Sequence, residues 1–187
     1  IKKTGLRINP EKCEIYKTKL KFVGHTVSED GIQTNSEKIK SITEATKPQC
    51  AKQLRSFLGL TNYYRRFVKD YAKIAAPLHA AASSCDKTIE WSENCENSFK
   101  QLKEALTQAP ILDFPRIDRK FILDTDASFE AIGAVLSQIK EDGSEIVIEY
   151  GSRNLTAHEK GYCVTRKDLL ALHEYVLYFR QYLYGKE

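Results

Sequence analysis

The sequence predicts an α+β fold in which a β-hairpin is followed by helices and then by an antiparallel meander of three strands with one more helix. Three observations support this class. Short β-prone runs lie before residue 35, apolar residues recur with helical spacing between residues 51 and 72, and β-rich runs alternate with turn residues after Pro110. The periodicity therefore changes from helical to extended at about residue 110.

The first element is a hairpin, because β-prone runs around Cys13–Tyr16 and Leu20–Val27 are followed by the turn pair Asp30-Gly31. A helix should come next. Thr34 and Glu37 have the Thr-x-x-Glu spacing of a capping box, in which a hydroxyl and a carboxylate satisfy free backbone N–H groups. This helix runs through Ile39 and Ile42 and ends before Pro48.

The longest predicted helix covers residues 51–72. Its apolar face is formed by residues at helical spacing: Leu54, Phe57, Leu58, Tyr64, Val68 and Tyr71. A further helix begins after the N-cap candidate Ser92, continues through Leu106, and is stopped by Pro110. The middle of the chain is thus predicted to be helical.

The last part contains the runs "KFILDTDAS", "AIGAVLSQI" and "SEIVIEYGSR", and the turn Glu141–Ser144 joins the last two. They predict an antiparallel meander. Thr165 and Asp168 have the spacing to cap a closing helix. The face predicted to be buried on that helix consists of Leu169, Leu172, Val176, Phe179 and Leu183.

Composition bounds the class of protein. With 187 residues, of which 42% are hydrophobic, the chain can form a packed core, and no run approaches the roughly 18 apolar residues of a membrane helix. The five cysteines have no zinc-site spacing, which favours reduced thiols in an intracellular protein, cytoplasmic or nuclear. The chain has no methionine, so we interpret it as a piece of a polyprotein.

The stretch "FLGLTNYYRRF" is unusual for a core helix. On a helical wheel one stripe beside the apolar face consists of Arg55, Gly59, Asn62, Tyr63 and Arg66. A glycine inside a helix costs about 1 kcal/mol relative to alanine, so close approach of another molecule or helix is indicated. Two interpretations stay open: contact with a nucleic-acid groove and its phosphates, or a helix crossing at Gly59 with solvated arginines.

A series of motifs carries a resemblance to a known family: "LKFVGHTVSEDGI", "LRSFLGLTNYYRRF", "FKQLKEALTQAPIL", "TDAS", "AIGAVLSQ", "YGSRNLT", "EKGYCVTRKDLLAL" and "FRQYLYG". In this order they resemble the reverse transcriptase and ribonuclease H region of gypsy-like LTR retrotransposons. The resemblance implies the last palm strands at 1–35, the helical thumb at 36–109, and the beginning of a ribonuclease H domain at 110–187.

The resemblance also implies roles for individual residues. Phe22, Gly24 and His25 lie in a primer-grip-like hairpin, and the thumb helix with Phe57, Gly59, Asn62 and Tyr63 follows the minor groove of an RNA/DNA duplex. The family's Tyr-x-Asp-Asp motif does not occur in this sequence, so the chain by itself is not expected to synthesise DNA.

Ribonuclease H chemistry needs carboxylates that hold two Mg²⁺ ions. Asp124 and Asp126 share one strand face, so geometry does not choose between them, but the resemblance selects Asp126 of "TDAS". The second acid of the family is a glutamate, and Asp168 stands in its place with a shorter side chain. Asp126 and Asp168 are therefore the candidate catalytic and metal ligands, with helix capping as an equal alternative for Asp168.

The remaining glutamates and histidines considered are not expected to take part in catalysis or metal binding. Glu145, Glu149 and Glu159 are expected to be solvated or capping, and His79, His158 and His173 to be surface or packing residues. The remaining acid of the family pattern would follow "YLYG", so neither a complete Mg²⁺ site nor cleavage activity is expected from these residues alone.

The expected function is that of a reverse transcriptase fragment that grips an RNA/DNA template-primer, with the rest of the polyprotein as partner and no membrane contact. A non-catalytic nucleic-acid-binding module and a structural relic are the alternatives. The small sheet and its helix are expected either to pack against the helical part or to expose an apolar patch and self-associate.

Overall fold

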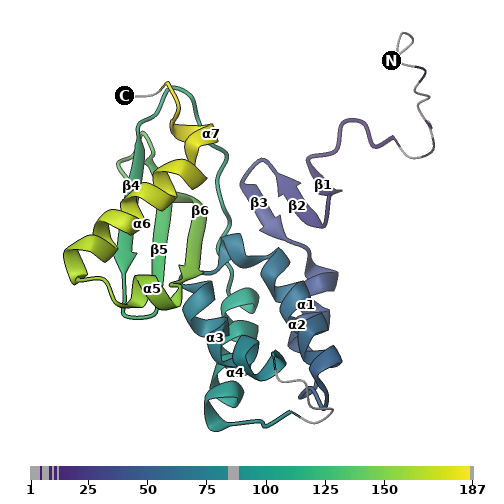
Figure 1. The fold of residues 1–187 in the computed structure, drawn as a ribbon. Coiled ribbons are helices and arrows are strands. Elements are labelled where there is room, and N and C mark those ends of the chain that lie inside the picture. The colour runs from purple at the N-terminus through teal and green to yellow at the C-terminus, as the bar shows by residue number, and fades with distance from the viewer. Residues whose placement is uncertain (1–4, 6–8, 10, 12, 84–88, 186–187) are drawn as a thin grey trace.

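The computed structural model describes residues 5, 9, 11, 13–83 and 89–185. Over these residues the α+β prediction is confirmed, and three units follow one another along the chain (Figure 1). They are an N-terminal meander (β1–β3), a helical unit (α1–α4) and a C-terminal sheet unit (β4–β6 with α5–α7). None of the helices in the described part of the chain is long and apolar enough to cross a membrane.

The N-terminal unit has three antiparallel strands, β1 (Lys19–Phe22), β2 (His25–Ser28) and β3 (Gly31–Thr34), so the predicted hairpin was incomplete. Residues 13–16 form no strand. The predicted run 20–27 is divided by a turn, because Val23 and Gly24 have positive φ angles of 42° and 69°. Glycine adopts this backbone without a steric penalty, which places the turn inside the β-prone run.

The first helix, α1 (Ser36–Thr43), is capped by Asn35 rather than by Thr34. The Asn35 side-chain oxygen accepts hydrogen bonds from the backbone N–H groups of Glu37 (2.9 Å) and Lys38 (3.4 Å). Thr34 is instead the last residue of β3. The helix was therefore predicted correctly and its cap was placed one residue too early.

The predicted helix 51–72 is two helices. Helix α2 (Ala51–Tyr63) is followed by the 3₁₀ turn η3 (Arg65–Phe67), and α3 (Tyr71–Ala82) begins after Asp70, whose φ is 56°. Helix α4 (Glu93–Thr107) begins after Ser92, whose hydroxyl accepts from the Cys95 N–H, as predicted. The break was missed because the apolar residues on both sides of it enter the same core.

This helical core reaches into both neighbouring units. Ile32 of β3 and Val147 and Tyr150 of the C-terminal sheet pack against it. Ile32 also forms a β-bridge with Leu112 in the segment after α4, through hydrogen bonds of 2.7 and 3.0 Å. The meander and the C-terminal sheet are therefore both attached to the helical unit.

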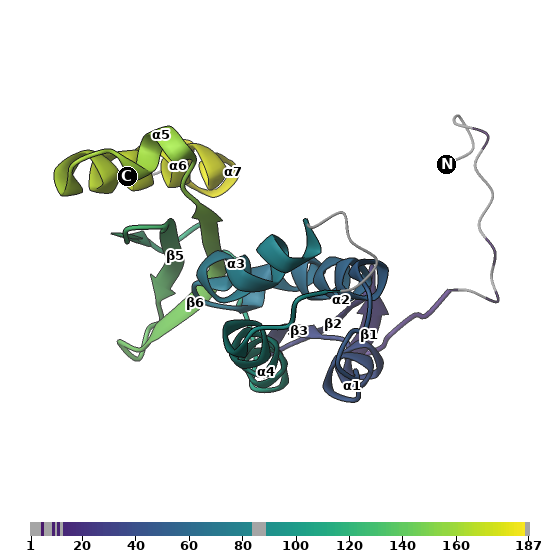
Figure 2. The same cartoon turned by 60° about the horizontal axis from the view of Figure 1, so that its bottom comes forward.

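The C-terminal sheet has the predicted antiparallel order β4 (Phe121–Ala127), β5 (Ala131–Ile139) and β6 (Glu145–Asn154). Helix α5 (Ala157–Lys160), helix α6 (Val164–Tyr178) and helix α7 (Arg180–Leu183) follow. Figure 2 shows α6 and α7 as a layer over one face of this sheet. Beside the other face lies α3, whose Ala72 N–H donates to the Ser152 hydroxyl at 2.9 Å.

The face predicted to be buried on this helix is correct only at its C-terminal end, where Phe179 is 0% exposed and Leu183 packs against the sheet cluster. Leu169, Leu172 and Val176 are 62%, 46% and 43% exposed, whereas Ala171 and Tyr175 are buried against the sheet. Both sides of this helix are apolar, so periodicity alone does not select one. The sheet selects Tyr175, whose ring fits at Gly151: a Cβ there would lie 2.5 Å from Tyr175 Cε1. The sheet unit thus both packs against the helical unit and exposes apolar side chains.

Glu159 has the capping role that was one of its expected alternatives, because it forms a capping box with Thr156. It also receives two hydrogen bonds from the Arg153 guanidinium, at 2.9 and 3.0 Å. The Arg153 guanidinium, followed by the Thr156 N–H, lowers the pKa of the Glu159 carboxyl from 4.5 to about 2. The carboxylate is therefore stabilised by folding.

A pH dependence follows from this carboxylate. Because the pKa in the folded protein lies below the ordinary value, its contribution to stability is complete above about pH 4.5 and is lost as the pH falls to about 2. We expect Glu159→Gln to be less stable than the parent chain by about 1–2 kcal/mol at neutral pH, and equally stable near pH 2. Urea unfolding of both proteins at the two pH values measures this. A difference in the free energy of unfolding that is the same at both pH values would contradict this assignment of the Glu159 carboxylate.

Candidate nucleic-acid interface

The turn between β1 and β2 presents apolar side chains to solvent. Phe22 is 63% and Val23 68% exposed. His25 is less exposed and lies against three rings, those of Tyr63, Tyr64 and Phe67, with centroid distances of 5.2, 5.6 and 5.6 Å. Its Nδ1 atom is 2.9 Å from the Val23 carbonyl oxygen. His25 therefore supports the turn, while Phe22 and Val23 form its outer surface.

Helix α2 continues this surface. Gly59 and Asn62 are exposed, and a Cβ at Gly59 would meet no atom within 4 Å. The alternative of a helix crossing at Gly59 is therefore wrong for the described residues. Tyr63 is 45% exposed, and its hydroxyl donates to the Val23 carbonyl oxygen. The ring of Tyr63 lies so close to Gly24 that a Cβ at Gly24 would be 3.0 Å from its hydroxyl oxygen.

Three other predicted contact residues make contacts within the protein, although Arg55 is exposed. Phe57 is only 7% exposed and lies 4.6 Å from Phe99, ring centre to ring centre. Arg55 donates from Nε and Nη2 to the Ala82 carbonyl oxygen at 3.2 and 3.1 Å, at the end of α3. Arg66 forms an ion pair with Glu149 at 3.2 Å, with its side chain 29% exposed. Among the predicted contact residues of α2, Arg55, Gly59, Asn62 and Tyr63 are therefore exposed, and the Arg55 guanidinium is already bound to a backbone carbonyl oxygen.

Glu149 is the residue that sequence reasoning missed, since it was expected to be solvated or capping. It is 7% exposed, and its carboxylate accepts hydrogen bonds from Tyr178 (3.1 Å) and Tyr182 (3.3 Å) as well as from Arg66. Burial, reinforced by the Glu149 charge, raises the pKa of both tyrosines. They therefore remain neutral donors at physiological pH. No local pattern marks such a glutamate, because its partners are distant in sequence.

Asp126 lies on the sheet face that turns toward α3. It is opposite Gly133, which in turn pairs with Ser152. A small cavity of about 30 Å³ separates these residues from α3, and its polar lining is Asp70, Lys73, Asp126, Ser128 and Ser152. Asp124 and Asp126 are both exposed, so the structure leaves both carboxylates accessible.

Asp168 is exposed on α6, which packs against the opposite face of the sheet. The capping interpretation of Asp168 is wrong, because α6 begins at Val164 with Cys163 as the preceding N-cap residue, and Thr165 is inside the helix. Within the described ranges, no three residues among His, Cys, Asp and Glu are grouped closely enough to hold a metal ion.

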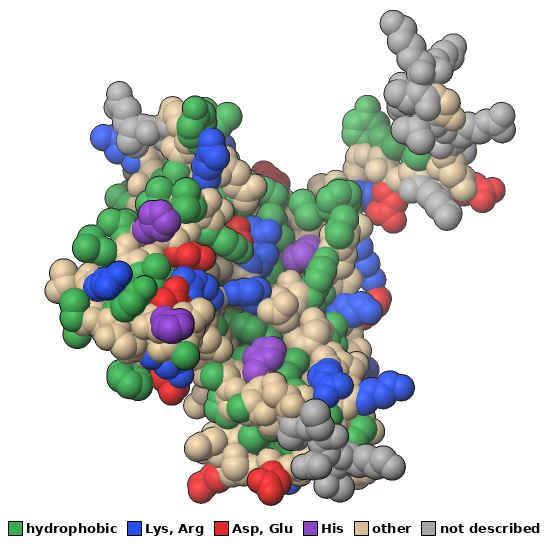
Figure 3. Space-filling model, viewed as in Figure 1, with side chains coloured by type: hydrophobic (Ala, Val, Ile, Leu, Met, Phe, Trp, Pro, Cys, Tyr) green, Lys and Arg blue, Asp and Glu red, His purple; other side chains and the backbone are tan. Residues whose placement is uncertain are grey.

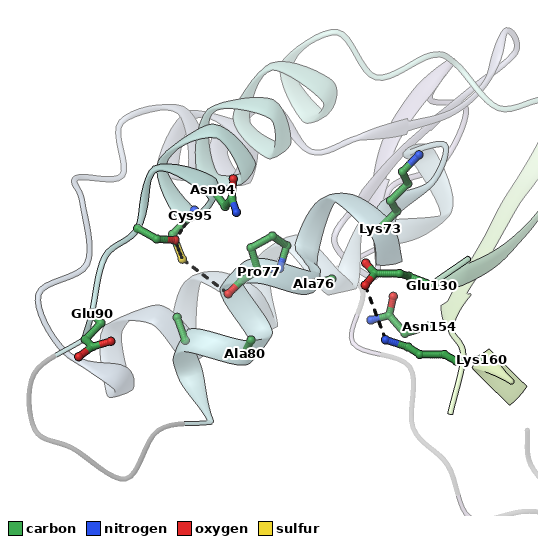
Figure 4. A pocket seen from close by; sticks show the side chains of 12 residues that line it. Lys73, Ala76, Pro77, Ala80, Glu90, Asn94, Cys95, Glu130, Asn154 and Lys160 are labelled. Atoms are coloured by element: carbon green, nitrogen blue, oxygen red, sulfur yellow. Dashed lines mark hydrogen bonds and ion pairs between the residues drawn. The ribbon is translucent and has the colours of Figure 1, made fainter. Parts of the chain in front are cut away.

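A larger groove of about 820 Å³ lies between α3, the start of α4 and the sheet unit (Figure 4). Ala76, Pro77 and Ala80 form part of its wall on α3. Lys160 and Glu130 lie on the sheet side and form an ion pair at 3.7 Å. Lys73 lines both this groove and the small cavity beside Asp126. Figure 3 shows further Lys and Arg side chains where the helical unit meets the sheet unit.

Comparison with known proteins agrees with this geometry. Residues 91–187 match the family model of the RNase H-like domain found in reverse transcriptase. The chain is 38% identical over 195 residues to the Retrovirus-related Pol polyprotein from transposon opus of Drosophila melanogaster, covering 99% of this chain and 19% of that protein. It is 37% identical over 192 residues to that from transposon gypsy of the same organism, covering 97% of this chain and 18% of that protein.

A solved structure shares the fold. The foamy viral protease-reverse transcriptase in complex with RNA/DNA hybrid superposes with a TM-score of 0.80 at 23% identity, covering 94% of this chain and 24% of that one. The chain spans less than a fifth of the length of the two curated relatives. It belongs to the family of RNase H-like domains found in reverse transcriptases and corresponds to the reverse transcriptase/RNase H region of gypsy-like Pol polyproteins.

Proposed function

We propose that this chain is the part of a retroelement reverse transcriptase that grips an RNA/DNA template-primer. The contact surface consists of Phe22, Val23, Gly59, Asn62 and Tyr63. The observation that carries the proposal is the open glycine at position 59, in the interior of α2 on its exposed side, with no described protein atom within 4 Å of where a Cβ would be. Glycine weakens a helix, and no internal contact of the described structure explains its presence.

The shape of the surface suits an A-like duplex. Such a duplex has a wide, shallow minor groove that displays 2′-hydroxyls and base edges. A helix without a side chain at Gly59 can approach that groove closely. The Asn62 amide beside it can donate and accept hydrogen bonds, and the apolar tip formed by Phe22 and Val23 lies next to Tyr63.

Substitution of Gly59 separates stability from binding. In the free protein Gly59→Ala has room for its methyl group and should stabilise α2, so we expect the free energy of unfolding to rise by about 0.5–1 kcal/mol. Gly59→Leu should also fold, but its side chain occupies the space that the duplex needs. We expect it to weaken binding of a labelled RNA/DNA hybrid by about tenfold or more, measured by fluorescence anisotropy.

The matched control is Gln101→Leu, which adds the same side chain to an exposed position of α4. It should leave the affinity unchanged. Binding by the parent chain should also weaken as salt increases, because phosphate contacts release counterions. If Gly59→Leu binds the hybrid as tightly as the parent chain, α2 is not the contact surface.

A non-catalytic nucleic-acid-binding module is the second candidate. It is favoured by the replacement of the family glutamate with Asp168. In that case hybrid binding remains, but no Mg²⁺-dependent cleavage of the RNA strand accompanies it. A structural relic would show neither binding nor cleavage.

A further inference from the structure

The segment Tyr63–Phe67, named the junction below, connects all three units of the protein. Each of its five residues makes a contact outside the helical unit: Tyr63 with the Val23 carbonyl, Tyr64 with the Gly24 carbonyl, Arg65 with the Ser152 carbonyl, Arg66 with the Glu149 carboxylate, and Phe67 with the His25 ring. Sequence reasoning assigned two of these five residues to nucleic acid. The structure turns the polar ends of all four polar members toward the protein.

On the meander side, the junction binds the turn between β1 and β2, in which Val23 and Gly24 have positive φ angles. The two tyrosine hydroxyls donate to consecutive carbonyl oxygens, those of Val23 and Gly24, the second at 2.7 Å. Both turn residues have positive φ angles, which is costly for the β-branched Val23. The hydrogen bonds from the tyrosines offset that cost and fix the turn relative to the end of α2.

On the sheet side, the junction ends at a buried charge. The Glu149 side chain is 9% exposed, and it is shared by Arg66 of the junction and by Tyr178 and Tyr182 of the last two helices. Removing one member of a buried ion pair leaves the other charge without compensation. The carboxylate thus connects η3, β6 and the α6–α7 region through one group.

A second attachment between strand β6 and the helical unit lies at Ser152, three residues after Glu149. The Ser152 carbonyl oxygen accepts from the Arg65 guanidinium, and the hydroxyl of the same serine accepts from the Ala72 N–H at 2.9 Å. Gly133 on the adjacent strand permits this approach, because a Cβ there would lie 3.1 Å from Asp70 Oδ1. Strand β6 is therefore attached to the helical unit at both Glu149 and Ser152.

We propose that the junction sets the orientation of the C-terminal sheet unit relative to the helical unit, and that Glu149 is the positioning residue that fixes it. The two arginines are then internal ligands of the fold rather than contacts for nucleic acid. This inference rests on the contacts alone and does not require that the chain bind a duplex. Its consequence is that loss of the Glu149 charge loosens the sheet unit while each unit remains folded.

The test measures a distance across the two units. Spin labels are placed at Lys100→Cys on α4 and Leu169→Cys on α6, in a background whose native cysteines are replaced. Both positions are accessible, because the Lys100 side chain is 64% exposed and Leu169 is 62% exposed. Double electron–electron resonance should give one narrow distance distribution for this protein. With Glu149→Gln added, which keeps the shape of the side chain and removes its charge, we expect a distribution about twice as wide or wider.

The matched control is Glu141→Gln, the same substitution in a surface ion pair with Arg119, where the glutamate side chain is 92% exposed. It should leave the distribution narrow. Circular dichroism establishes that each variant is folded at the temperature of measurement. Should Glu149→Gln fail to fold, Arg66→Lys keeps the charge but loses reach and should broaden the distribution less. A narrow, unshifted distribution in a folded Glu149→Gln or Arg66→Lys protein overturns the proposal.

Discussion

Replacing Gly31 by alanine is expected to lower the free energy of unfolding by about 3–5 kcal/mol. Gly31 has a φ of +132°, a conformation that residues with a side chain rarely adopt. A Cβ there would also overlap the Leu112 carbonyl oxygen and lie 3.1 Å from Ile111 Cγ2. The Leu112 carbonyl cannot withdraw without breaking its hydrogen bond to the Ile32 N–H, at 2.7 Å. The strain and the clash therefore add.

Urea unfolding of Gly31→Ala and of Gly143→Ala separates the two causes. Gly143 also has a positive φ, of 83°, but a Cβ at that position would meet no atom within 4 Å. Its substitution should cost only the backbone strain, about 1–2 kcal/mol. Equal losses in the two variants would show that contact with Leu112 contributes nothing, and that the attachment of the meander to the segment after α4 is weak.

The second large effect is expected at Phe179. Its side chain is fully buried, at 0% exposed, among aromatic residues of α6 and α7. The nearest is Tyr178, at a ring-centre distance of 4.9 Å. Truncation to alanine leaves a cavity that the rigid neighbouring rings cannot fill, so we expect a loss of about 3–5 kcal/mol.

The position of Phe179 predicts which part of the protein loses stability when its side chain is truncated. Because Phe179 belongs to the cluster formed by the sheet and α6, hydrogen exchange should accelerate most in β4–β6 and α6, and less in α2–α4. Leu177→Ala is the control, since Leu177 is 57% exposed on the same helix and should cost less than about 1 kcal/mol. Uniform acceleration over all helices and strands would instead show that the two cores unfold as one cooperative unit.

Several elements were predictable because short-range patterns determine them. The β4–β6 meander followed from alternating apolar residues and a glycine-containing turn, and the start of α4 followed from Ser92. The open position at Gly59 was also indicated by sequence, because an interior glycine in a strong helical pattern is costly wherever it occurs.

The roles of the arginines were not predictable in the same way. Arg55 is bound to a carbonyl 27 residues away and Arg66 to a carboxylate 83 residues away. A helical wheel records the direction of a side chain but not what lies there. Both arginines were therefore expected to face solvent or a nucleic acid; Arg55 is exposed as expected, whereas Arg66 is partly buried against Glu149.

The sequence alone determined the α+β class, the β4–β6 meander, the ribonuclease H-like motifs and the glycine on the exposed side of α2, because each depends on residues that are close together in the chain. Only the tertiary structure decided which face of α6 is buried, where the helix 51–72 breaks, and that Glu149 is a buried partner of Arg66. These features depend on the surfaces that other units present. Burial and ion pairing are properties of the assembled protein, so local periodicity does not contain them.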